Sequence, residues 1–127
     1  MDGVVHFEVP ADDVKRAKTF YEKSFGWQIA EFPGMEYWGC ITTKVDEKTR
    51  LPLSPGAING GLAKRGMVKS PTFTINVEDI DKAVKKITAA GGKVTVPKMP
   101  VGGMGFLAYF TDTEGNTIGL WQNAPMK

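Results

Sequence analysis

This sequence of 127 residues has one imidazole and one thiol with which to bind a transition metal: His6 is the single histidine and Cys40 the single cysteine. A thiolate zinc site needs several Cys and His together, and a redox CxxC motif needs two cysteines. The iron site of two histidines and one carboxylate needs a second histidine. One chain can build none of these sites. A disulfide scaffold is also excluded, and an unpaired thiol is typical of a reducing compartment.

The composition is that of a soluble globular protein, because 42% of the residues are hydrophobic and 24% are charged. A chain of this length can bury a core large enough to fold without a disulfide or a structural metal. We therefore expect a single domain over residues 1–127.

Charge and targeting signals exclude several kinds of partner. With 16 basic and 14 acidic residues the formal net charge is +2, too small a bias for nucleic acid or an anionic membrane to be the main partner. Residues 1–5 lack the basic region and apolar run of a signal peptide, and no stretch approaches membrane-spanning length. These features predict a cytoplasmic protein.

The sequence contains an internal repeat. A shift of 66 positions lays residues 5–31 over residues 71–97 without a gap. Both copies show an alternating strand, then an amphipathic helix, then further strand-like sequence. The residues that coincide are Phe7 with Phe73, Asp13 with Asp79, Ala17 with Ala83 and Gly26 with Gly92.

The patterns predict eight strands and two helices. Alternating apolar residues indicate strands, while acidic residues before an apolar helical stripe and glycine after it indicate the ends of helices. The expected strands lie at about 3–9, 27–32, 36–44, 57–63, 72–77, 93–96, 103–112 and 117–123, and the helices run from Asp12 or Asp13 to Gly26 and from Glu78 or Asp79 to Gly91.

Each half therefore has the order βαβββ, over about residues 1–64 and 70–127. One helix leaves half of a four-stranded sheet uncovered, so two copies should pair. The predicted fold is α+β, with two βαβββ modules that form one curved mixed sheet and carry their helices on the convex side. Strand parity then places His6, Glu8, Thr72 and Thr74 on the concave face. That face is more polar than a core, which predicts a pocket.

Three segments resemble a known family. They are VHFEVPADD at residues 5–13, AKTFYEKSFGW at residues 17–27 and TDTEGNTIGLW at residues 111–121. They are similar to the opening and closing segments of the vicinal oxygen chelate superfamily, which includes glyoxalase I, bleomycin-resistance proteins and extradiol dioxygenases. The resemblance covers nearly the whole chain and implies the paired βαβββ fold. It does not specify a reaction.

In metal-dependent members, the resemblance implies one ligand on the first strand and one carboxylate on the last strand of each module. His6 stands at the first of these four positions. Thr72 stands at its equivalent in the second half, and the two carboxylate positions fall on Gly61 and Gly119. One imidazole without carboxylate partners cannot hold Zn²⁺, Ni²⁺ or Fe²⁺ in the usual site. A metal site would then require the carboxylate of Glu8 or Glu36 to point into the concave face and serve as a ligand.

We therefore expect a glyoxalase-like protein that binds a small organic molecule in the concave cavity, without a cofactor and without the usual catalytic metal. It would sequester the molecule or transform it by metal-free chemistry, so whether it is an enzyme stays open. The first alternative is a metal-dependent lyase or isomerase with a non-standard ligand set. The second is a dimeric stress or regulatory protein with a vestigial pocket. The resemblance also implies a homodimer. The expected ligand-binding residues are His6, Glu8, Asn59, Thr72, Thr74 and Trp121, with His6 as the candidate catalytic acid or base.

Several of these residues also have a plain structural interpretation. His6 could be a relict histidine bonded to its neighbours, and Glu8 a solvated or ion-paired strand residue. Cys40 lies in a strand-like segment, where buried packing is the commoner role of a free cysteine. The glycine-rich segment at residues 102–105 precedes a strand instead of opening a helix, so a phosphate-binding loop is rejected.

Overall fold

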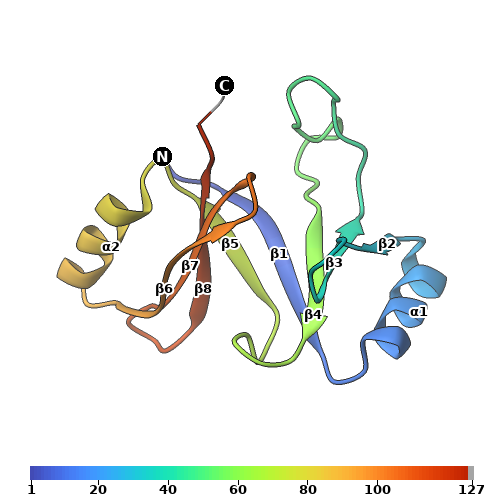
Figure 1. Ribbon diagram of the computed structural model, residues 1–127, viewed down its shortest axis with the longest axis horizontal. Helices are drawn as coiled ribbons and strands as arrows, with labels where there is room; N and C mark the ends of the chain where they lie inside the picture. The colour runs from blue at the N-terminus through green and yellow to red at the C-terminus, as the bar shows by residue number, and fades with distance from the viewer. Residues whose placement is uncertain (126–127) are drawn as a thin grey trace. The chain divides into compact units, whose positions relative to one another are not determined.

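The computed structural model describes residues 1–125, which form two compact units. The first unit, His6–Pro71, is called the N-terminal module below. The second, called the C-terminal module, consists of Met1–Val5 together with the chain from Thr72 onward. Each has the order βαβββ (Figure 1), so the predicted α+β class and the two βαβββ modules are confirmed.

The N-terminal module has a four-stranded mixed sheet in the order β2-β3-β4-β1. The first strand runs parallel to β4, and the remaining neighbours are antiparallel. Parallel pairing brings Glu8 opposite Gly61 in the register. The elements are β1 (Val4–Ala11), α1 (Val14–Phe25), β2 (Gln28–Glu31), β3 (Tyr37–Ile41) and β4 (Gly60–Lys64).

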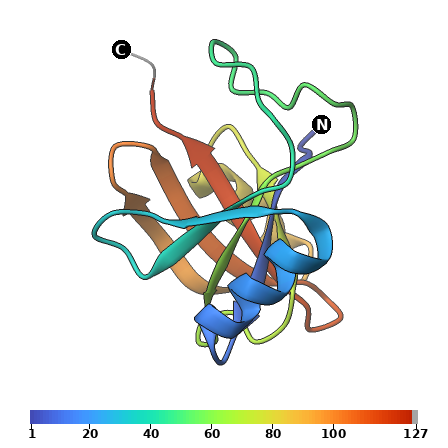
Figure 2. The ribbon, with the colours of Figure 1, turned by 90° about the vertical axis from the view of Figure 1, so that its right-hand side faces the viewer.

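Helix α1 begins and ends where the sequence indicates. The side chain of Asp13 accepts a hydrogen bond from the backbone N–H of Arg16 at 3.0 Å, and Gly26 closes the helix with a left-handed φ of 72°. Figure 2 shows α1 in front of the sheet of its module. The apolar side of α1 packs over a core of Ala11, Ile29, Cys40 and Leu62, and Phe7 and Val9 of β1 face the same core.

The C-terminal module repeats this arrangement with the strand order β5-β8-β7-β6. Its parallel pair, β5 with β8, sets Thr74 opposite Gly119. The core consists of Val77, Ile80, Ala108, Phe110, Ile118 and Leu120. The elements are β5 (Thr72–Asn76), α2 (Ile80–Ala89), β6 (Lys93–Val101), β7 (Gly105–Thr111) and β8 (Thr117–Asn123).

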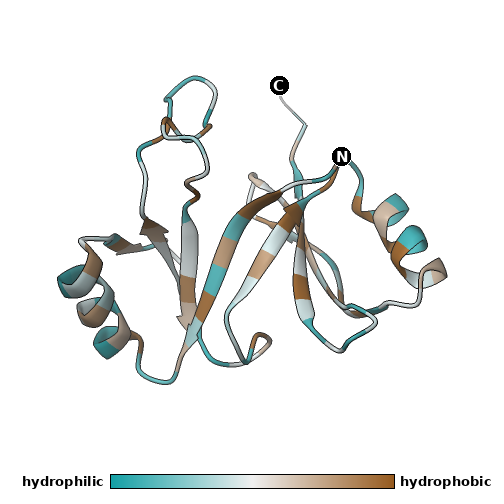
Figure 3. Ribbon diagram, turned by 180° about the vertical axis from the view of Figure 1, so that it is seen from behind, coloured by the Kyte–Doolittle hydropathy of each residue, from teal (hydrophilic) through white to brown (hydrophobic). Residues whose placement is uncertain are grey.

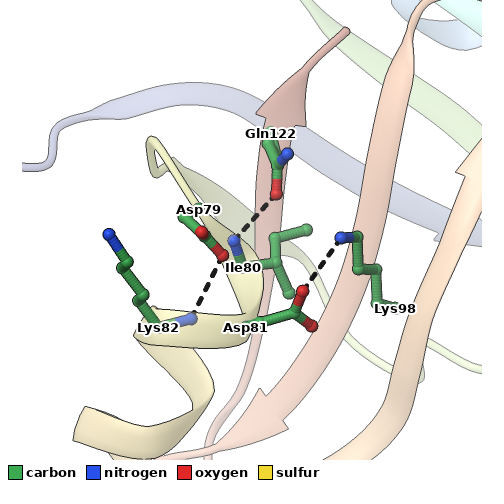
Figure 4. A network of polar contacts seen from close by, with 6 residues as sticks. All are labelled: Asp79, Ile80, Asp81, Lys82, Lys98 and Gln122. Carbon is green, nitrogen blue, oxygen red and sulfur yellow. Dashed lines mark hydrogen bonds and ion pairs between the residues drawn. The ribbon is translucent and has the colours of Figure 1, made fainter.

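Two side chains satisfy the free amides at the start of α2. Asp79 accepts from the N–H of Lys82 at 3.2 Å, and the side-chain oxygen of Gln122 on β8 accepts from the N–H of Ile80 at 2.8 Å (Figure 4). Asp81 pairs with Lys98 on β6 at 3.1 Å, with 70% of the Asp81 side chain exposed. The helix start is thus fixed to the sheet through Gln122.

The cap gives a first testable prediction. Asp79→Ala should lower the free energy of unfolding by about 1 kcal/mol, because an orphan N–H in the first turn loses its acceptor. Asp81→Ala is the matched control two residues further along, where an exposed ion pair contributes roughly 0–1 kcal/mol. Urea denaturation of both variants measures the difference. An equal or larger loss in Asp81→Ala would contradict the assigned cap.

The structure corrects some predicted strand ends. The strand expected at residues 93–96 continues to Val101 in β6, although it contains Pro97 and Pro100. The reason is that β6 is last in the strand order of its module and pairs with β7 alone, and an edge strand tolerates proline. The strand expected from residue 57 begins at Gly60 instead. Ile58 and Asn59 hydrogen-bond to Thr42 and Thr43 outside the ladder.

The predicted amphipathic patterns are visible in the structure. Figure 3 shows alternating hydropathy along β1 and both hydrophobic and hydrophilic residues on each helix. Within residues 1–125, no helix is both long and apolar enough to cross a membrane.

Candidate functional site

His6 forms a hydrogen-bonded pair with a residue that sequence reasoning missed. The Nε2 atom of His6 lies 2.6 Å from the hydroxyl oxygen of Tyr37. His6 comes from β1 and Tyr37 from the start of β3, the two sides of β4. The side chain of Tyr37 crosses over Gly61 on β4, where an added Cβ atom would clash with the phenol hydroxyl. The His6–Tyr37 hydrogen bond therefore requires glycine at position 61.

Aromatic rings hold Tyr37 in place. Its ring stacks on Phe32 with centroids 5.8 Å apart and on the His6 ring with centroids 6.3 Å apart. Gly39 leaves room for the Phe32 ring, which lies 3.3 Å from the position of a Cβ atom there. The module thus builds a rigid aromatic setting for the His6–Tyr37 pair on the sheet face opposite α1.

The surroundings keep both partners of the pair uncharged at neutral pH. Burial lowers the pKa of His6 below its usual value. Burial also raises the pKa of Tyr37 far above its usual value, and the electrostatic influence of Glu8 and of Cys40 adds to that shift. A neutral imidazole and a protonated phenol are hence the species that meet at 2.6 Å.

Glu8 shares the helix-free face of β1 with His6, as strand parity predicts. It lies opposite Gly61 and is only 8% exposed. Glu8 is therefore not a solvated strand residue, and of its plain structural interpretations the ion-paired one stays a prediction. Glu8 therefore lies opposite the glycine over which the Tyr37 side chain passes.

Asn59 supports the backbone of the N-terminal module. Its side-chain oxygen accepts hydrogen bonds from the N–H of Thr42 at 2.8 Å and of Thr43 at 2.9 Å. That oxygen is thus engaged in tying the end of β3 to the start of β4. No pattern in the sequence around Asn59 distinguishes this supporting role from ligand binding.

In the C-terminal module, Thr72, Thr74 and Trp121 lie on the helix-free face. The hydroxyl of Thr72 donates to the carbonyl of Thr117 at 2.5 Å, and the Trp121 indole donates to the Asn123 side chain at 2.8 Å. Thr74 is 2% exposed, and its hydroxyl has no hydrogen-bond partner among residues 1–125. A Cβ atom at Gly119 would lie 2.8 Å from that hydroxyl oxygen.

The residues present do not fit the metal site implied by the family resemblance. A carboxylate at position 61 would have to displace Tyr37, and one at position 119 would crowd Thr74. The Nε2 atom of His6 is already engaged by a phenol. Throughout the described part of the chain, no group of three or more His, Cys, Asp or Glu side chains lies close enough to hold a metal ion.

Two hollows of about 430 and 540 Å³ belong to the C-terminal module. The smaller is lined by the first residues of the chain together with residues 76–78 and Asn123. The larger lies beside α2 and is lined in part by Ile75, Phe110 and Leu120. None of the six predicted ligand-binding residues lines either hollow. The His6–Tyr37 pair does not line these hollows either.

Cys40 is a core residue, 1% exposed, and burial raises the pKa of its thiol to about 11 from an ordinary 9.0. This higher pKa makes the reactive thiolate roughly 100-fold scarcer at neutral pH. Iodoacetamide at pH 7.5 should therefore alkylate Cys40 at least ~100-fold more slowly in the folded protein than in 8 M urea, as measured by mass spectrometry. Similar rates in the two states would contradict the buried placement.

Comparisons with known proteins agree with this fold. The sequence profile described as the Glyoxalase/Bleomycin resistance protein/Dioxygenase superfamily matches residues 3–120. The Mycobacterium tuberculosis protein CFP32 is 30% identical over 119 residues, which cover 91% of this chain and 43% of CFP32. The chain thus spans about half the length of the first curated relatives it matches.

A relative of similar length is a glyoxylase-like domain-containing protein of Didymella fabae. It is 33% identical over 116 residues, 87% of this chain and 85% of that protein. Among solved structures, methylmalonyl-CoA epimerase from Mycobacterium tuberculosis has a TM-score of 0.60 at 14% identity, over 97% of this chain and 89% of the epimerase. At that identity the likeness shows the fold alone.

Proposed function

Because the chain belongs to the Glyoxalase/Bleomycin resistance protein/Dioxygenase superfamily, we propose that it binds a small organic molecule without the family's usual metal. The binding face is the helix-free side of the N-terminal module, around His6, Glu8 and Tyr37. On the corresponding face of the C-terminal module, Thr74 and Trp121 are the proposed ligand contacts.

One observation carries this proposal: the hydroxyl of Tyr37 fills the space over Gly61 and bonds to Nε2 of His6. Tyr37 occupies the space that a carboxylate ligand at position 61 would need. The Nε2 atom of His6, which would face a metal, is hydrogen-bonded to the same phenol. What is left is a polar pair beside aromatic rings, with Phe32 37% exposed. Such a combination suits an organic molecule that has both a flat apolar part and a polar group.

The experiment is a thermal-shift screen of the untagged protein, in the presence and absence of EDTA. The ligands are a chemically broad metabolite library that includes bleomycin and methylmalonyl-CoA. A ligand at a hundred times its Kd should stabilise the protein by roughly 2.7 kcal/mol, which raises Tm by several degrees. The shift should persist in EDTA and disappear in His6→Ala. Leu51→Ala, at an exposed residue of the same module, is the control that should retain it.

Two outcomes of the screen contradict the proposal. A shift that requires a metal and vanishes in EDTA would favour a metal-dependent lyase or isomerase with a non-standard ligand set. If no ligand in the library raises Tm, a stress or regulatory protein with a vestigial pocket would be favoured.

The proposal includes a homodimer in the cytoplasm. The first curated relatives are about twice as long as this chain, so a second copy would supply an equal length of protein. Light scattering should give twice the chain mass of 13.8 kDa. A mass of one chain at micromolar concentration would contradict the dimer.

A further inference from the structure

His6 uses only one of its two ring nitrogens inside the protein. Nε2 is hydrogen-bonded with the Tyr37 hydroxyl at 2.6 Å. Among residues 1–125, Nδ1 makes no hydrogen bond, and the side chain is half-buried rather than enclosed. The nitrogen through which His6 can meet a ligand is therefore Nδ1.

The direction of the hydrogen bond determines what Nδ1 can do. With both groups neutral, either the phenol O–H donates to Nε2 or an Nε2–H donates to the phenol oxygen. A phenol O–H is the stronger donor, and the lone pair of an imidazole nitrogen is the stronger acceptor. The first direction is thus preferred. When Nε2 accepts, the single proton of the neutral imidazole lies on Nδ1.

The setting keeps both partners neutral. The electrostatic influence of Glu8 opposes loss of the phenol proton, and burial opposes a second proton on the imidazole. Gly61 leaves the phenol its place, and stacking on Phe32 fixes the ring. The pair is therefore held neutral and in one place, and the donor strength of the phenol sets the direction of the hydrogen bond.

We infer that the Nδ1–H of His6 donates a hydrogen bond to the ligand, and that Tyr37 is the positioning residue that fixes this tautomer. The inference rests on the proposed function and narrows the ligand class. A fixed N–H donor selects an acceptor, so the ligand presents a carbonyl or carboxylate oxygen at this point. A group with only N–H donors, such as an alkylammonium ion, is rejected.

The tautomer can be measured directly, because His6 is the only histidine. In protein labelled with ¹⁵N-histidine, the two ring-nitrogen resonances separate a protonated nitrogen from an unprotonated one. At neutral pH we expect the proton on Nδ1. Tyr37→Phe should abolish this preference, and Tyr21→Phe, the same change on the opposite face of the sheet, should leave it intact. A proton on Nε2 in the wild type, or an unchanged tautomer in Tyr37→Phe, would overturn the inference.

The ligand class is tested on the same sample with two small probes at constant ionic strength. Sodium acetate offers only acceptor oxygens, and ethylammonium chloride offers only donors. Acetate should move the Nδ1 resonance saturably, and its affinity should fall several-fold in Tyr37→Phe, because the imidazole there no longer holds its proton on Nδ1 before the probe binds. No saturable shift with acetate, or one with ethylammonium alone, would overturn the inference.

These results separate the inference from the proposed function. Ligands that stabilise the protein while His6 has its proton on Nε2 would leave the function standing and remove the donor role. If His6 has the expected tautomer but no metabolite stabilises the protein, the donor role would stand and the proposed function would fall. Thermal unfolding of Tyr37→Phe and Tyr21→Phe verifies that both variants are folded at the temperature of measurement.

Discussion

Gly61→Ala is expected to lower the free energy of unfolding by roughly 1–3 kcal/mol, the range for overpacking a filled site. The added methyl group would clash with the Tyr37 hydroxyl, which is held by His6 and by the stacked Phe32 ring. Tyr37 would have to leave its position, and the His6–Tyr37 hydrogen bond would be lost with it. Urea denaturation measures the stability, and ligand binding should fall in the same variant.

Two further variants isolate the cause of that loss. Gly103→Ala adds the same methyl group where no atom lies within 4 Å, so its effect should be small. In a Tyr37→Ala background the obstructing ring is absent, and adding Gly61→Ala should then cost far less than it does alone. An equal cost with and without Tyr37 would contradict the packing of Tyr37 over Gly61.

Leu62→Ala is expected to have the largest effect, a loss of about 2–5 kcal/mol in the free energy of unfolding. Leu62 is fully buried and lies between Val9 on β1 and Trp38 on β3 in the strand register. Removing its side chain leaves a cavity under the strand that carries Gly61. Because typical domains are stable by only about 5–15 kcal/mol, this change removes a large share of the total.

The matched control for Leu62→Ala is Leu51→Ala, which makes the same change at a residue that is 65% exposed. Its effect should stay within about 0.5 kcal/mol, as is usual for surface substitutions. Guanidinium denaturation followed by tryptophan fluorescence measures both. A cost for Leu51→Ala close to that for Leu62→Ala would contradict the assigned core.

The sequence predicts the face on which His6 lies but not its partner. Alternation along β1 places His6 and Glu8 opposite the core, because side chains of a strand point to opposite faces in turn. Tyr37 comes from a strand separated from β1 by a helix and another strand. Its position relative to Gly61 depends on the register of β3 against β4, which no local pattern specifies.

In the sequence, glycine at positions 61 and 119 indicates that two carboxylate ligands are missing, but it does not indicate which side chains occupy their space. The structure shows a phenol over Gly61 and a buried threonine hydroxyl beside Gly119. In both cases the neighbour comes from an adjacent strand, so its identity depends on long-range pairing. Asn59 illustrates the same limit, since its hydrogen bonds go to Thr42 and Thr43, 17 and 16 residues away.

The central claim is that a phenol, and not a metal ion, engages Nε2 of the only histidine. Titration of the metal-free protein with Zn²⁺, followed through the ¹⁵N resonances of His6, tests it most directly. We expect both ring-nitrogen resonances to stay in place at one equivalent of Zn²⁺. A saturable displacement of the Nε2 resonance that is complete at one equivalent would contradict it.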